Sequence, residues 1–224
     1  MKKYSLILAL VILSFVLANT QVRANLISTF DSSDEGWTTF NRPTALNPNP
    51  PANEFTGSWQ STGGNLDGFF QGVDTGDGGI GFFVAPSSWP DDLSQYIGGT
   101  LQYDIKLIYK QGGDPIVFPY DILIFEDSIN YAYSSLGVSP VLGQWQSYSV
   151  ALIPSNFTVV GDTFNNIMSD VAGIRIRGEY FYFDETMGLD NVRVSAVPEP
   201  STLLLLGSGL IGLAGYGKKK LFKK

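Results

Sequence analysis

The side chains that could do chemistry in this chain are few in kind. The 224 residues include no histidine and no cysteine, which excludes Ser-His and Cys-His nucleophilic sites, thiol chemistry and most zinc or copper sites. Carboxylates remain as possible catalysts. A glycosidase needs two of them across a cleft, and the acidic loops offer candidates without any local motif. We therefore predict that the protein is not an enzyme.

Acidic residues dominate the part of the chain between its two ends. Residues 25–197 contain 20 acidic and 6 basic side chains, a formal charge of −14. Such a surface repels nucleic acid and anionic lipid. It is compatible with neutral polysaccharide, with solubility alone, or with calcium, which prefers carboxylate and carbonyl oxygens.

Asp190 is the main candidate ligand for calcium. It has the same strand parity as Val192 and Val194, so if those valines face the core its carboxylate also points inward and requires a partner. That partner is either a cation or the backbone amides of a turn, and both alternatives stay open. Asp74 and Asp77 are weaker candidates, because their Asp-Thr-Gly-Asp-Gly segment resembles an EF-hand loop but lacks its final glutamate.

Aromatic residues in or beside the predicted loops are candidates for contact with sugar rings, because they offer apolar area at a low entropy cost. Most aromatics in a domain of this size belong to the core, so packing is the alternative at each position. The run at 180–183 is predicted to lie at an edge of the core. The sugar-contact candidates are Trp59, Trp89, Phe69 and Phe70.

The elements that must position these residues are predicted to be strands. Turn-forming residues punctuate the chain, and the segments between them are rich in aromatic and β-branched types, which is typical of an antiparallel β-sandwich. Ile174 and Ile176 are predicted to face inward, and Arg175 and Arg177 outward. The predicted strands are 79–84, 101–109, 121–126, 131–134, 145–152, 173–180 and 189–195.

One short helix and two long loops complete this prediction. The helix is expected at 163–171, where apolar residues follow an i, i+3, i+4, i+7 pattern and Asp162 can cap the free amides. Residues 41–52 and 57–81 are rich in proline or glycine and are predicted to be loops that carry function.

The two ends of the chain indicate export. Lys2 and Lys3 precede an apolar run at 6–18, which is typical of a signal peptide, and we predict cleavage after Ala24. At the other end, a Pro-Glu-Pro box precedes an apolar stretch and a lysine cluster. As a helix, residues 202–217 would measure about 24 Å against a hydrocarbon core of about 30 Å. We predict a signal segment at 1–24, a sandwich domain at 25–197 and a sorting and anchor segment at 198–224.

The C-terminal segment closely resembles the PEP-CTERM sorting signal, whose box corresponds here to Pro198, Glu199 and Pro200. Box, apolar segment and basic end occur in the order that this signal requires. The resemblance implies recognition by an exosortase-type enzyme, a transient anchor helix in the inner membrane, and final residence in the cell envelope or outside the cell.

From residue 59 to residue 194 the chain resembles the laminin B domain, also called laminin IV type A. The matching elements are Phe-Val-Ala-Pro at 83–86, Tyr-Ile-Gly-Gly-Thr-Leu at 96–101, Ile-Arg-Ile-Arg-Gly-Glu-Tyr at 174–180 and Leu-Asp-Asn-Val at 189–192. The resemblance implies a jelly-roll β-sandwich similar to carbohydrate-binding modules, without known catalysis. In similar sandwiches an acid after the first strand and an Asp on the last strand bind structural calcium, which here implies Asp31 and Asp190.

These observations favour an exported, non-catalytic protein of the cell envelope or extracellular matrix that interacts with exopolysaccharide. The first alternative is a carbohydrate-binding module with a defined glycan site. The second is a glycan hydrolase.

Overall fold

A computed structural model describes residues 25–42, 55–76, 79–197 and 208–209. Residues Asn25–Ala196 form one compact unit. The predicted signal segment, the Pro-Glu-Pro box, most of the C-terminal apolar stretch, Asp77 and the loop after residue 42 lie outside the described residues. In the part of the chain that is described, no helix has the length and apolar character needed to cross a membrane.

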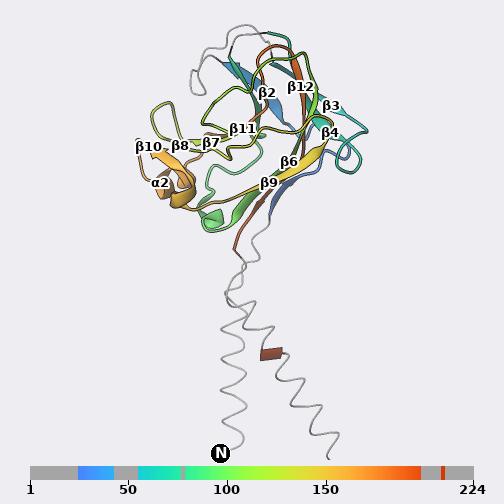
Figure 1. Ribbon diagram of the computed structural model, residues 1–224. Helices are drawn as coiled ribbons and strands as arrows, with labels where there is room; N and C mark the ends of the chain where they lie inside the picture. Colours follow the sequence, from blue (N-terminus) through green and yellow to red (C-terminus); the bar gives the residue numbers. More distant parts are fainter. Residues whose placement is uncertain (1–24, 43–54, 77–78, 198–207, 210–224) are drawn as a thin grey trace, which may run out of the picture. The chain divides into compact units, whose positions relative to one another are not determined.

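Two antiparallel sheets of six strands each face one another, as Figure 1 shows. In sheet A the order is β3-β4-β12-β6-β9, and β1 also pairs with β12; in sheet B the order is β10-β8-β7-β11-β5-β2. The strands of sheet A are β1 (Leu26–Ser28), β3 (Phe55–Gln60), β4 (Phe69–Asp74), β6 (Thr100–Lys110), β9 (Trp145–Ala151) and β12 (Glu185–Ser195). The strands of sheet B are β2 (Thr38–Arg42), β5 (Ile80–Val84), β7 (Ile122–Phe125), β8 (Tyr131–Ser134), β10 (Thr158–Val160) and β11 (Gly173–Arg177). The predicted all-β antiparallel sandwich is confirmed.

The core lies between the inner faces of the two sheets. Alternating side chains of β6 face this core, where Leu101, Tyr103, Ile105 and Leu107 are at most 1% exposed. Burial of such side chains stabilises the fold by about 1.5 to 3 kcal/mol each. Helix α2 (Phe164–Ser169) packs against β7 and β8. Its N-cap is Thr163, whose hydroxyl accepts a hydrogen bond from the amide of Asn166, and not Asp162 as the sequence suggested.

The segment predicted to be a loop at 57–81 contains β3, β4 and the start of β5, so that prediction was wrong. Two of its glycines, Gly72 and Gly81, make room for a side chain. The ring of Phe55 lies directly on the backbone of Gly72 and Gly81, where a Cβ would overlap it. Glycine therefore lets sheet A and sheet B approach each other around this ring.

Candidate functional site

The outer face of sheet B carries a group of half-buried aromatic rings around Arg175. Register places Tyr133, Leu123 and Arg175 side by side across β8, β7 and β11. The guanidinium carbon of Arg175 lies 3.6 Å from the ring centre of Phe40 and 4.4 Å from that of Phe125. We call this surface the aromatic face, and it comprises Phe40, Phe118, Tyr120, Phe125, Tyr131, Tyr133 and Arg175.

The rings of the aromatic face hold one another in fixed orientations. Tyr120 meets Tyr133 edge to face at 4.4 Å between ring centres, and Phe118 meets Tyr120 in the same way at 4.9 Å. Burial raises the pKa of Tyr120, and nearby Tyr131 and Tyr133 raise it further. Its hydroxyl therefore stays protonated at neutral pH and can donate a hydrogen bond.

Depressions at both ends of β5 extend the aromatic face. One has a volume of about 320 Å³ and is lined by Trp89, Val84 and Phe125 among others. The other, of about 300 Å³, is lined by Phe118, Ile80, Tyr182 and Phe183 among others. Ile80 and Val84 lie about 14 Å apart at the usual rise of a strand, ~3.4 Å per residue. The three areas together form an elongated surface with an aromatic ring in each part.

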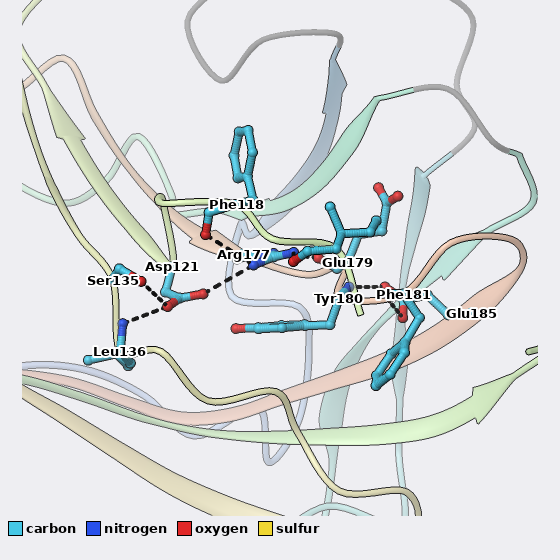
Figure 2. Close-up of polar contacts among 10 residues, drawn as sticks. Phe118, Asp121, Ser135, Leu136, Arg177, Glu179, Tyr180, Phe181 and Glu185 are labelled. Atoms are coloured by element: carbon cyan, nitrogen blue, oxygen red, sulfur yellow. Dashed lines mark hydrogen bonds and ion pairs between the residues drawn. The ribbon is translucent and has the colours of Figure 1, made fainter. Parts of the chain in front are cut away.

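The segment that brings Phe118 and Tyr120 onto this face is fixed by the buried side chain of Arg177. Its Nη2 donates to the carbonyl of Ile116 at 2.8 Å, and its Nη1 lies 3.5 Å from Oδ1 of Asp121. Asp121 also accepts a hydrogen bond from the amide of Leu136 at 2.6 Å. Figure 2 shows Arg177 between Asp121 and Phe118. Arg177 does lie on the outer face, as predicted, but it is only 3% exposed, because residues 112–121 cover it.

The run at 180–183 divides between core and surface. Tyr180 and Phe181 are 2% and 7% exposed, whereas Tyr182 and Phe183 are 52% and 46% exposed. The prediction of a core edge therefore holds for the first pair only. The amides of Tyr180 and Phe181 donate to the carboxylate of Glu185 at 2.5 and 3.2 Å, so this buried acid holds the segment that presents the exposed pair (Figure 2).

The four aromatic residues proposed from the sequence have different surroundings. Trp89 is half-buried beside the aromatic face and meets Trp37 edge to face at 5.6 Å. Trp59 packs against the core and donates from Nε1 to the carbonyl of Phe30 at 2.7 Å. Phe69 and Phe70 are 6% and 3% exposed, so neither offers an open ring face. Only Trp89 borders the aromatic face.

Of the proposed calcium ligands, Asp74 lies apart from Asp190, and Asp77 is outside the described residues. Asp74 pairs with Glu185 in register, five residues along β12 from Asp190, which is about 17 Å at ~3.4 Å per residue. Asp31 is exposed and accepts a hydrogen bond from the hydroxyl of Thr29. Within the described ranges, no three or more His, Cys, Asp or Glu side chains form a group that could hold a metal ion.

Asp190 faces the outside of sheet A and not the core, contrary to its strand parity with Val192. A bulge between Asp190 and Arg193, with Asn191 at a φ of 49°, shifts the alternation by one residue. Oδ2 of Asp190 accepts from the amide of Asn65, and Oδ1 from that of Asn191, both at 2.7 Å. Burial, together with the nearby carboxylates Asp104 and Asp31, raises the pKa of Asp190 to about 6, although the two amides oppose the rise. Each carboxylate oxygen of Asp190 therefore accepts one backbone amide in this arrangement.

Comparisons with known structures show that the described unit is similar in fold to a laminin domain and to a carbohydrate-binding module. The L4b domain of human laminin alpha-2 superposes with a TM-score of 0.55 at 12% identity, over 78% of this chain and 98% of that domain. The family 11 carbohydrate-binding module of a Clostridium thermocellum cellulosomal cellulase gives a TM-score of 0.50 at 12% identity, over 80% of this chain and 98% of the module. These likenesses show the fold.

The C-terminal segment carries the more specific identification. Residues 196–219 match the PEP-CTERM protein-sorting motif, as the Pro-Glu-Pro box predicted. The motif indicates an exported, envelope-directed protein and implies processing by an exosortase-type enzyme. No curated protein matches the chain in sequence at a significant level.

Proposed function

We propose that this protein is a non-catalytic component of the cell envelope or extracellular matrix that binds the glycan chains of exopolysaccharide through the aromatic face of sheet B. The observation that carries this proposal is the set of partly exposed rings around Arg175. Aromatic rings stack on the apolar faces of sugars, and Tyr and Arg supply hydrogen bonds at their rims. The acid excess of residues 25–197 favours a neutral glycan.

The sorting motif supports the proposal that the protein acts in the cell envelope or extracellular matrix. We further propose that the apolar stretch after the Pro-Glu-Pro box anchors the chain transiently in the inner membrane, with its lysines on the cytoplasmic side. Exosortase-type processing would then release the sandwich to the envelope, where polysaccharide is available.

Affinity electrophoresis of the full chain, in a detergent without a sugar headgroup, tests glycan binding. Separate gels contain a soluble β-glucan, galactomannan or dextran. Tyr131→Ala and Trp89→Ala each remove a ring from the elongated surface, so each is expected to weaken retardation by about tenfold, or ~1.4 kcal/mol. Tyr131→Phe keeps the ring and is the matched control, expected to stay within about threefold of the parent.

Four outcomes separate the alternatives, three from these gels and the fourth from an assay of reducing ends. Retardation by one glycan only indicates a defined glycan site, whereas similar retardation by several indicates a general matrix component. Unchanged retardation of both ring variants would refute the aromatic face as the binding surface. Release of reducing ends from any of the polysaccharides would instead support a glycan hydrolase.

A structural calcium ion at Asp190 and Asp31 remains a separate proposal, and melting in calcium and in chelator tests it. A calcium ion with a dissociation constant far below its concentration would raise the melting temperature, because it binds only the folded state. The rise should disappear in Asp190→Asn and persist in Asp74→Asn, since Asp74 lies on β4 opposite Glu185, five residues along β12 from Asp190. Identical melting in calcium and chelator would leave the backbone amides as the partners of Asp190.

A further inference from the structure

The outer face of sheet A, on the opposite side of the sandwich, contains a depression of about 350 Å³. It lies over β1, β12, β6 and β9, and its lining combines polar side chains with apolar surface from Ile27, Tyr103 and Tyr148. We call it the polar groove; its side chains include Thr29, Gln102, Asp104, Ser147, Ser149 and Arg193.

Two rows of side chains cross the polar groove with different roles. In the first row, Arg193, Gln102 and Ser149 lie directly opposite one another on β12, β6 and β9. All three are exposed, and none has a side-chain hydrogen bond or ion pair within the described residues. In the second row, Asp104 accepts hydrogen bonds from the hydroxyl of Ser147 at 2.5 Å and from Nδ2 of Asn191 at 2.9 Å. The first row is therefore available to a ligand, and the second is a fixed wall.

The chemistry of the first row matches a neutral glycan. Its guanidinium, amide and hydroxyl groups follow one another at the spacing of adjacent strands, about 4.8 Å, and supply both donors and acceptors. Sugar hydroxyls both donate and accept hydrogen bonds, so they can pair with both kinds of group. A polyanion would fit poorly, because Asp104 and Asp190 lie beside the row and residues 25–197 carry −14.

We propose that the polar groove is a second glycan site and that the sandwich is bivalent, so one molecule bridges two polysaccharide chains. The two sites lie on the outer faces of sheets that pack about 10 Å apart, and a glycan that lies along one face does not reach the other. This inference rests on the proposed function, because the aromatic face provides the first site. Its consequence is that the protein cross-links polysaccharide and does not merely coat it.

Light scattering of a soluble neutral polysaccharide titrated with the full chain tests bivalency. The probe is whichever of β-glucan, galactomannan or dextran retards the protein in the gel assay. The parent is expected to raise scattering and then lower it at protein excess, when every glycan site is filled separately. Gln102→Ala/Arg193→Ala removes two exposed donors, and it should still be retarded in the gel while scattering falls at least tenfold.

Thr56→Ala is the matched control, because Thr56 is exposed on the same side of sheet A but outside the polar groove. The Thr56→Ala variant should scatter like the parent. Any clustering of the protein in detergent micelles affects this control and the double variant alike. A double variant that scatters as strongly as Thr56→Ala would overturn the bivalent model, as would a parent that is retarded without scattering. In both cases binding through the aromatic face would stand. Absence of retardation in every gel would instead remove the proposed function together with this inference.

Discussion

Arg177→Met is expected to lower the free energy of unfolding by about 3 to 5 kcal/mol, because it leaves a buried charge without its partner. Arg177 and Asp121 are each only 3% exposed. The guanidinium also donates from Nε to the carbonyl of Glu179 and from Nη1 to that of Phe118. Its loss therefore frees residues 112–121 as well as the Asp121 carboxylate. Urea unfolding of the full chain at neutral pH measures the effect.

A set of partner variants separates lost charge from lost packing. Asp121→Asn combined with Arg177→Met removes both charges and should recover part of the stability. Arg177→Lys keeps a charge but cannot supply the planar fork of donors, so it should remain destabilised. Arg193→Ala removes an exposed arginine and should change stability by no more than about 0.5 kcal/mol. A fall in the free energy of unfolding of less than about 1 kcal/mol in Arg177→Met would contradict a stabilising role for the buried Arg177–Asp121 pair.

The effect of Arg177→Met should extend to glycan binding, since the residues that it fixes carry Phe118 and Tyr120. This coupling explains why a basic residue occupies a buried position in so acidic a domain. Arg177 orders a segment of irregular backbone whose apolar side chains pack on the outer face of sheet B. Within the described residues, no second sheet covers that face to hold them in place.

Alternation along the chain predicted the strands that have one buried and one polar side. Strand β6 was expected at 101–109 and is found at Thr100–Lys110, and β8 has the predicted bounds. Strands β3 and β4 were missed because glycine is depleted in strands. Gly72 makes room for the ring of Phe55, a residue 17 positions away in the sequence. Local composition alone does not distinguish this role from that of a glycine in a loop.

The aromatic face was missed for a similar reason. Tyr131, Tyr133 and Arg175 were already assigned to predicted strands, and their parity placed them on one side of each strand. What the sequence lacks is the strand order, in which β7 separates β8 from β11 and gathers these side chains on one surface. The orientation of Asp190 was also beyond simple parity, because a single bulged residue reverses the alternation.

Glu185→Gln is expected to make the protein more stable than the parent at pH 8 and to reduce the fall in stability between pH 5 and pH 8. Glu185 is fully buried at the start of β12, with Glu179 and Asp74 nearby. Burial raises its pKa to about 9; the amides of Tyr180 and Phe181 oppose the rise, and the two neighbouring acids add to it. An uncharged amide removes the cost of the buried charge, although its Nε2 cannot accept the hydrogen bond that Oε2 accepts from the amide of Phe181.

The sign of the pH dependence follows from the protons that each state holds. In the unfolded chain Glu185 ionises near its ordinary pKa of ~4.3, whereas in the folded protein it keeps its proton up to about pH 9. The associated stability is fully present below pH ~4.3 and is lost as the pH rises, by about 1.4 kcal/mol per pH unit until the folded pKa is reached. Asp190, with a pKa of about 6, acts in the same direction over a narrower range.

Unfolding of the parent and of Glu185→Gln in urea at pH 5 and pH 8 isolates this group, because every other acid is common to both. The difference between the two proteins should grow in favour of the variant by more than 1 kcal/mol from the lower pH to the higher. Asp114→Asn changes an exposed acid and should follow the parent at both values. Parallel behaviour of Glu185→Gln and the parent would mean that Glu185 is ionised in the folded protein at both pH values and is held as a carboxylate by the amides of Tyr180 and Phe181.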